Sequence, residues 1–487
     1  MSAAAPAIPV TNDFADWLSP ILVKELRQGL QARTFVSMFI VVQVVMILLV
    51  GFHLLSLSTN AGTSGFDGFF WFFVGFPLLI LMPARGLAAV SEEMRANTLD
   101  LVRLTRLTAF RIILGKWIAL VSQSGLLVAA ILPYAVLRYF FGRVDVVLEL
   151  QSLGWLLAAS FVITAGAIAL STAHLVLRVL ILLAALPSFL TFSFTVALSR
   201  AFGGGGYSSV GFVPVDDWWL ILIAMAVYVV MFLEYAASKI APQSENHSAR
   251  KRSAVLLFSI VLVAAGWLGG PPWYFSIALW MAPIINWVIV EALTENPVLL
   301  PSLFMPFARR GIIGRLAGRF LYPGWATAIM FTALVEGLLF LGVCGVAKFD
   351  PIPESSKLAF YAVWVLVFLA LVAPLPIMFL FKRVEKRFWL YLLIQLVFVL
   401  LFAAASTVAD RDSPSAFYWL APFPASALLA MLSHADHAEL AAFYLTTTSV
   451  VGGVLLLFLA FIMRREFRAY SMLEKSAAAG IKKNSQA

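Results

Sequence analysis

Residues 84–116, ARGLAAVSEEMRANTLDLVRLTRLTAFRIILGK, form a long charged insert between two strongly apolar stretches of the chain. The residues before it, 69–82, and after it, 112–137, are almost wholly apolar. Runs of about 20 apolar residues are long enough to cross a bilayer as helices. The insert is therefore predicted to be a loop that connects two membrane spans.

A short amphipathic helix is expected inside this loop. Asn97 and Thr98 are residue types that begin helices, acids lie upstream of them and arginines lie near the end, an order that suits the helix dipole. Apolar side chains follow at helical spacing. They are Leu99, Val102, Leu104 and Leu107. We expect this helix to lie at the membrane face.

Composition supports membrane insertion of the whole chain. Of 487 residues, 62% are hydrophobic and 12% are charged, whereas soluble domains contain roughly 25% charged residues. The net charge of +9 does not indicate nucleic-acid binding, because the basic residues sit in short loops and not in a stripe interleaved with aromatics. The single cysteine, Cys344, gives no disulfide framework and no metal motif.

The predicted fold is an all-α polytopic membrane protein of about twelve transmembrane helices in two six-helix halves. The expected spans are 35–57, 69–88, 112–135, 152–173, 177–198, 218–237, 254–270, 274–293, 326–347, 359–381, 388–408 and 441–463. With the amino terminus inside, most of the 34 Lys and Arg residues fall on the cytoplasmic side, as the positive-inside rule requires. Both termini are therefore expected to be cytoplasmic.

Four parts follow from this layout. Residues 1–240 hold six spans and begin with an amphipathic helix that leads into the bilayer, and 241–253 is a cytoplasmic linker containing Lys251 and Arg252. Residues 254–470 hold the second six spans, and 471–487 form a cytoplasmic tail. The second half has no acidic pair and no Thr-Leu-Asp-Leu in its corresponding inner loop. The two halves are therefore only partly similar.

The insert resembles the coupling region of permease subunits of type 2 ABC exporters. The likeness consists of an acidic pair, an arginine, Thr-Leu-Asp-Leu, Leu-Thr and a Gly-Lys that opens the next span. The matching positions are Glu92, Glu93, Arg95, Thr98, Leu99, Asp100, Leu101, Leu104, Thr105, Gly115 and Lys116. The sequence departs from the family at Asn97, where Gly is common, and at Arg106, where Pro is common. The six-span layout extends the likeness to roughly the first half of the chain.

The resemblance implies a function and a set of partners. In that family this loop docks onto a separate ATP-binding subunit, so the chain would be the transmembrane subunit of an ATP-driven exporter with an unidentified substrate. The sequence has no Gly-x-x-x-x-Gly-Lys-Ser/Thr motif. ATP and Mg²⁺ are thus expected on the partner, and this chain is expected to be neither an enzyme nor a cofactor protein. Membrane lipid is a further expected partner, and the sequence leaves open whether one chain or a pair of permease chains forms the pathway. The protein is expected to be a multi-pass protein of the bacterial cytoplasmic membrane.

Polar residues within the spans are sparse. Glu336 is treated as the one acid that the spans offer, and it is either a packing group or a member of the substrate path. Gln43 and Gln123 are predicted to join helices by hydrogen bonds. In the outer loop, a cluster of His and acids could hold zinc, but a solvated face is favoured and no metal site is predicted. The cluster is His434, Asp436, His437 and Glu439.

Two other classes of function stay open. A secondary transporter also has many spans in two halves, but ion coupling usually needs several intramembrane charges. A membrane-embedded lipid- or glycan-modifying enzyme would need a cluster of acids at one interface. The outer loops offer only a thin version of such a cluster. It consists of Asp410, Asp412, Asp436 and Glu439.

Overall fold

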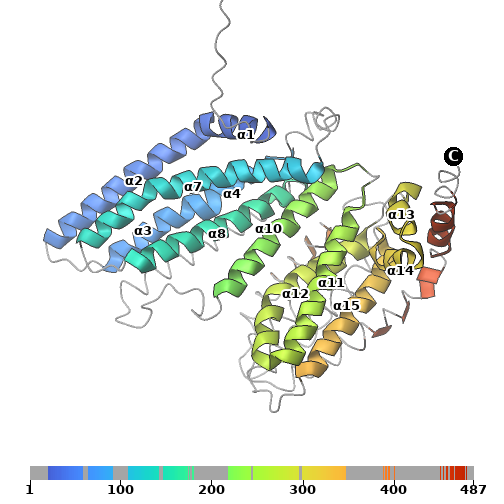
Figure 1. Cartoon of the computed structure of the whole chain (residues 1–487). Helices are drawn as coiled ribbons and strands as arrows, with labels where there is room; N and C mark the ends of the chain where they lie inside the picture. The colour runs from blue at the N-terminus through green and yellow to red at the C-terminus, as the bar shows by residue number, and fades with distance from the viewer. Residues whose placement is uncertain are drawn as a thin grey trace, which may run out of the picture. The chain divides into compact units, whose positions relative to one another are not determined.

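The computed structural model describes seven stretches and some scattered positions. The stretches are 20–58, 64–91, 108–141, 146–173, 218–242, 245–295 and 299–346, and the scattered positions fall within 175–179, 388–400 and 450–479. All regular elements in these residues are helices, with no strand among them. The chain separates into two compact units, Met1–Ile240 and Ala241–Ala487 (Figure 1).

The first unit is built from eight described helical elements. They are α1 (Pro20–Gln31), α2 (Arg33–Ser58), α3 (Ser64–Phe76), the π-turn η1 (Pro77–Leu81), α4 (Met82–Gly86), α7 (Ala109–Phe141), α8 (Val146–Leu170) and α10 (Trp218–Ile240). α3, η1 and α4 follow one another without a break, and Pro77 begins the π-turn because proline has no N–H to give to a regular α-helix. α7 contacts α1, α2, α8 and α10, and it therefore forms the centre of this unit (Figure 1).

An apolar core joins five of these elements. It consists of buried side chains from α2, α3, η1, α7 and α8, namely Val42, Met46, Phe70, Val74, Leu78, Leu127, Val128, Ile131, Ala135 and Leu153. Polar contacts add to it, since the Tyr134 hydroxyl donates to Gln43 Oε1 at 2.8 Å. The predicted role of Gln43 in joining helices is confirmed. At one end of α7 and α8, Arg138 and Glu149 form a buried ion pair of 2.6 Å.

Six of the described helices are long and apolar enough to cross a membrane by length and composition. They are Arg33–Phe52, Phe69–Gly86, Ala109–Phe140, Val146–Leu170, Trp219–Ile240 and His247–Leu268. Each overlaps one of the twelve predicted spans. Two further predicted spans, 274–293 and 326–347, coincide with helices of the second unit. The spans predicted at 177–198 and 359–381 lie almost wholly outside the described residues, and those at 388–408 and 441–463 are described only at scattered positions.

Among the described residues up to 346, the second unit has three long helices and two short ones. They are α11 (His247–Leu268), α12 (Gly270–Thr294), α13 (Pro301–Ala308), α14 (Gly311–Leu321) and α15 (Trp325–Val346). α11 packs on α15 through glycines, because a Cβ on Gly266 would lie 2.3 Å from the carbonyl oxygen of Gly342. Small residues of this kind let helix backbones approach closely in membrane proteins. Figure 1 shows α11, α12 and α15 side by side.

The end of the second bundle is covered by α13, α14 and a helical run at 467–477. An apolar cluster joins α13, the turn after α14, α15 and this run, and its buried members are Leu303, Phe304, Tyr322, Ala326, Tyr470 and Ala477. α11 begins at His247, inside the stretch 241–253 that the sequence predicted as a linker. Asn246 caps the helix there, because its side-chain oxygen accepts a 2.9 Å hydrogen bond from the Ala249 N–H.

Candidate functional site

Most of the predicted coupling residues lie outside the described part of the chain. These are Glu92, Glu93, Arg95, Thr98, Leu99, Asp100, Leu101, Leu104 and Thr105. The other two, Gly115 and Lys116, lie in the second turn of α7 and are buried. The structure therefore describes the helices on either side of the predicted loop, and the contacts that fix them form the first candidate site.

Lys116 forms an ion pair with the amphipathic helix α1. Its Nζ lies 3.0 Å from Glu25 Oε1, and the two side chains are 7% and 24% exposed. α1 presents Lys24 and Arg27 to the surface, as its predicted amphipathic pattern requires. A buried ammonium needs such a partner, because unpaired charge is costly to bury. Lys116 is thus engaged within the chain, where it holds α1 against the start of α7.

Arg85 fixes the other side of the loop. The guanidinium of Arg85, at the end of α4, donates to the Gln123 side-chain oxygen on α7 and to the Gly29 carbonyl of α1. Gln123 therefore joins helices, as predicted. Gly29 leaves room for this contact, since a Cβ there would lie 2.1 Å from Gln123 Nε2. Arg178 adds a further link, because it donates at 3.2 Å to the Leu87 carbonyl.

Three sets of polar contacts therefore join helices around the two ends of the predicted loop, and we call their five side chains the loop base. Its members are Glu25, Arg85, Lys116, Gln123 and Arg178. It links α1, α4, α7 and the segment after α8. Both helices that flank residues 92–107 are thus fastened to the same amphipathic helix. The sequence alone gave no indication that Glu25 and Arg178 belong together.

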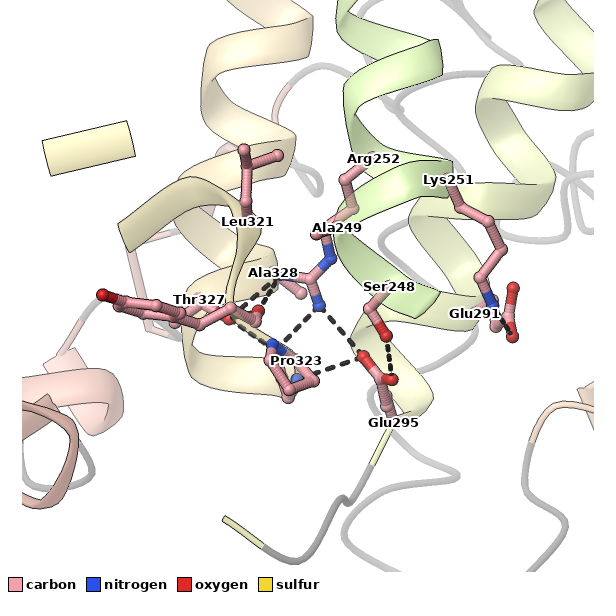
Figure 2. A network of polar contacts seen from close by, with 12 residues as sticks. Ser248, Ala249, Lys251, Arg252, Glu291, Glu295, Leu321, Pro323, Thr327 and Ala328 are labelled. Carbon is pink, nitrogen blue, oxygen red and sulfur yellow. Dashed lines mark hydrogen bonds and ion pairs between the residues drawn. The ribbon is translucent and has the colours of Figure 1, made fainter. Parts of the chain in front are cut away.

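A second polar group surrounds Arg252 at the start of α11 (Figure 2). Arg252 is 1% exposed and is among the largest fully buried side chains of the described residues. Its Nη2 donates to Glu295 Oε2 at 3.1 Å and to the Gly324 carbonyl at 3.2 Å. Its Nη1 donates at 2.6 Å to the Tyr322 carbonyl and at 3.0 Å to the Thr327 hydroxyl. The fork of donors on one arginine thus holds the ends of α12, α14 and α15.

Glu295 and the backbone complete this arrangement. The Ser248 hydroxyl donates to Glu295, and the Gly324 N–H donates to the same carboxylate at 3.1 Å. Gly324 has φ of 115°, which favours glycine because a side chain would be strained there. The Thr327 hydroxyl donates in turn to the Tyr322 carbonyl at 2.5 Å. A sharp turn between α14 and α15 is thereby shaped to accept the guanidinium.

Lys251 lies next to Arg252 and pairs with Glu291 on α12 at 2.6 Å, and both side chains are less than a tenth exposed. We call the whole group the Arg252 network. Its members are Ser248, Lys251, Arg252, Glu291, Glu295 and Thr327 (Figure 2). Lys251 and Arg252 were expected in the linker 241–253, whereas both lie in the first turns of α11 and are buried. Glu291 and Glu295 stand four residues apart at the end of α12, so one helix face carries both acids, and that spacing was a signal the sequence analysis missed.

Two tyrosines lie beside this turn. The Tyr470 hydroxyl, from the run at 467–477, donates to the Pro323 carbonyl at 2.9 Å. The Tyr322 ring packs against Phe304, with ring centroids 4.4 Å apart. Burial raises the pKa of the Tyr322 phenol above its ordinary value, and Glu474 raises it further. The carboxyl-terminal segment therefore contacts the same turn that Arg252 holds.

The two groups consist of ion pairs and hydrogen bonds between helices. Both join separate helices at one end of a bundle through charges. Such contacts can act as a permanent brace, or they can open and re-form when the helices move.

Glu336 is buried in α15 at 8% exposure, and its Oε1 has no hydrogen-bond partner among the described residues. The expectation that Glu336 is the one acid within the spans is wrong. Glu149, Glu234 and Glu291 are also buried in helices. The outer residues Asp410, Asp412, His434, Asp436, His437 and Glu439 lie outside the described part of the chain. Among the residues that are described, no group of three or more His, Cys or acidic side chains could hold a metal ion.

Comparison with models of known protein families, with curated proteins and with solved structures gives no match. The likeness to type 2 ABC permeases therefore rests on the residues of the insert and the layout of spans. The loop base and the Arg252 network rest on the structure.

Proposed function

We propose that this chain is the transmembrane subunit of an ATP-driven ABC transporter, an exporter whose ATP is hydrolysed by a separate ATP-binding subunit. The loop 92–107 is the docking element for that subunit. The observation that carries the proposal is the loop base, in which the helices on both sides of this loop are tied to the amphipathic helix α1. A docking loop can move spans only if its two ends are fixed to them.

The proposed coupling follows from these contacts. When the ATP-binding subunits close, they push on the loop and therefore on α4 and α7 together. Lys116 and Arg85 carry the displacement to α1 through Glu25 and the Gly29 carbonyl. The membrane-crossing parts of α4 and α7 then tilt, which changes access to the substrate path.

Twelve spans and cytoplasmic termini belong to the same proposal. Within each unit, loops assigned to the cytoplasmic face gather at one end. In the first unit these are the segments around Glu25, Arg85, Lys116 and Arg178. In the second unit, Arg252, the turn 322–324 and Tyr470 come together. Loops that lie at the same membrane face must be separated by an even number of spans, as they are in the twelve-span layout.

The test is mild-detergent purification from native membranes, followed by mass spectrometry of co-purified chains and an ATP hydrolysis assay. We expect a subunit with a Walker-type motif and ATPase activity. Deleting 98–104, or replacing Glu93 by Lys, should remove both while the chain stays inserted. Glu245→Lys is the control, because it makes the same charge change at an exposed acid of another loop. Retention of the subunit in the deletion variant would exclude docking through this loop.

A second candidate, a secondary transporter, is favoured by one specific observation. The described helices bury several ionisable groups, Glu234, Glu291, Lys251 and Glu336 among them, and such groups mark ion and substrate pathways in transporters. In that case the purified chain would lack ATPase activity and an associated subunit. Transport in proteoliposomes would then depend on an ion gradient and would be lost in Glu336→Gln. Transport that required ATP would reject this candidate.

A further inference from the structure

The short helix α14 has two contrasting sides. Gly314 and Gly318 are buried, and a Cβ on Gly318 would lie 2.4 Å from the Tyr322 ring. Ile312, Ile313 and Leu316 are 79%, 83% and 57% exposed. At about 100° per residue, the aliphatic positions occupy the side of the helix away from the glycines. α14 therefore packs by its glycines and exposes three large aliphatic side chains.

The same connection is strongly basic. Arg309, Arg310 and Arg315 are exposed, and Arg319 lies with its guanidinium carbon 5.7 Å from the centroid of the Phe467 ring. The chain has no acidic residue between Glu295 and Glu336. Arginines therefore flank the aliphatic side of α14. Arginines that flank an apolar helix face are typical of helices that lie in a membrane surface.

The chain also limits where α14 can be. It connects α12 and α15, which are apolar helices of 25 and 22 residues and two of the proposed spans. α14 must therefore lie close to a membrane surface if those helices cross it. Figure 1 shows α14 beside α15, at the end of the bundle where the Arg252 turn lies.

A membrane fits this surface better than a protein partner does. Three aliphatic side chains can bury only a fraction of the roughly 800 Å² per partner that stable protein interfaces bury. A lipid leaflet needs no large matching surface, because apolar insertion and attraction to anionic headgroups act together. Long arginine side chains can reach headgroup phosphates while the aliphatic groups stay in the acyl region.

We propose that α14 is an in-plane membrane helix that inserts Ile312, Ile313 and Leu316 into the leaflet and binds the phosphates of anionic phospholipids through Arg309, Arg310 and Arg315. This site anchors the turn between α14 and α15 that Arg252 holds. Lipid composition would then act on the Arg252 network through the position of α14. The inference requires that α12 and α15 cross the membrane, and it does not depend on ATP-driven transport.

The experiment places a fluorescent probe at a single cysteine in the full chain, after Cys344→Ala removes the native thiol. Ile313→Cys is compared with Ser302→Cys, an exposed polar position on the neighbouring helix α13. The chains are reconstituted in phosphatidylcholine vesicles and in vesicles of phosphatidylcholine with phosphatidylglycerol. Quenching by aqueous iodide is measured against quenching by lipids that carry a nitroxide on the acyl chain.

At Ile313 we expect strong quenching by the labelled lipid and iodide quenching about threefold or more below that at Ser302, as for a probe below the headgroups. Lipid quenching should increase when phosphatidylglycerol is present. Arg309→Gln with Arg310→Gln should remove that increase. Iodide quenching at Ile313 equal to that at Ser302, with none by the labelled lipid, would overturn the inference.

Two other results would also overturn it. If neither quencher reaches Ile313 in native membranes but iodide reaches it after purification, a protein covers α14 instead of lipid. If the increase with phosphatidylglycerol persists in the double arginine variant, the headgroup site is not formed by these arginines. Loss of ATPase association in the purification test leaves each of these readouts unchanged, so the two proposals fail separately.

Discussion

The loop base and the Arg252 network both hold charged groups at helix ends, but their contacts differ. The loop base divides its contacts among three cations, and its acid Glu25 is 24% exposed. The Arg252 network uses one fully buried guanidinium with five acceptors. The first arrangement can be broken one contact at a time, whereas the second loses several contacts with one side chain.

This difference indicates which of the two polar groups can open more easily. Partly exposed ion pairs exchange readily with water and contribute little individually. A buried pair that loses one partner leaves an uncompensated charge, so its opening costs much more. The loop base is therefore suited to transmit a displacement from residues 92–107. The Arg252 network is suited to keep α11, α12 and α15 together during that displacement.

Arg252→Met should give the largest effect on stability. The substitution leaves Glu295 without its cationic partner and removes the donor to the carbonyls of the turn. Breaking a buried pair in this way costs about 3–5 kcal/mol. The measurement is the free energy of unfolding of the detergent-purified chain. Arg250→Met is the matched control, because Arg250 is exposed on the same turn of α11. Equal losses in both variants would contradict a brace centred on Arg252.

Lys116→Met should have a smaller effect, of about 2 kcal/mol, as for loss of a hydrogen bond to a charged group. Glu25 can take up water once its partner is gone, so the penalty stays below that of Arg252→Met. Lys24→Met, at an exposed position of α1, should change stability little. A double variant with Glu25→Gln should add almost nothing to Lys116→Met. Additive losses would show that the two side chains do not stabilise each other.

The stability of the second unit should fall at high pH because of Tyr322. Burial raises the pKa of its phenol, so the folded chain holds this proton more tightly than the unfolded chain does. The contribution is complete below about pH 10, the ordinary tyrosine value, and is lost above it by about 1.4 kcal/mol per pH unit until the folded pKa is reached. Melting temperatures from pH 9 to 11 should fall less in Tyr322→Phe. Parallel curves would refute the assignment to Tyr322.

The smallest effect is expected from Tyr470→Phe. The loss of its hydrogen bond to the Pro323 carbonyl should lower the free energy of unfolding by about 1 kcal/mol at neutral pH. Tyr322→Phe serves as the matched control, because the Tyr322 hydroxyl has no hydrogen-bond partner among the described residues. That variant should be nearly neutral at the same pH. A larger loss for Tyr322→Phe than for Tyr470→Phe would reverse this ranking.

Much of the fold could be predicted from hydropathy, because a helix that crosses a bilayer must carry about 20 apolar residues in sequence. Six of the predicted spans correspond to described helices of sufficient length and apolarity. Gln43 and Gln123 were recognised as polar residues within apolar spans, and both join helices. The coupling helix expected from Leu99 to Leu107 lies outside the described residues and stays a prediction.

The sequence by itself determined that this chain is helical and rich in apolar segments, since both properties follow from local composition. Only the tertiary structure decided which charges meet. Lys116 pairs with Glu25, 91 residues away, and Arg252 holds a turn some 70 residues further along the chain. Hydropathy is a property of neighbouring residues, whereas the pairing of buried charges depends on which helix ends the packing brings together. The basic pair Lys251 and Arg252 was assigned to a linker for this reason, because the acids Glu291 and Glu295 lie 40 and 43 residues away from their partners in the sequence.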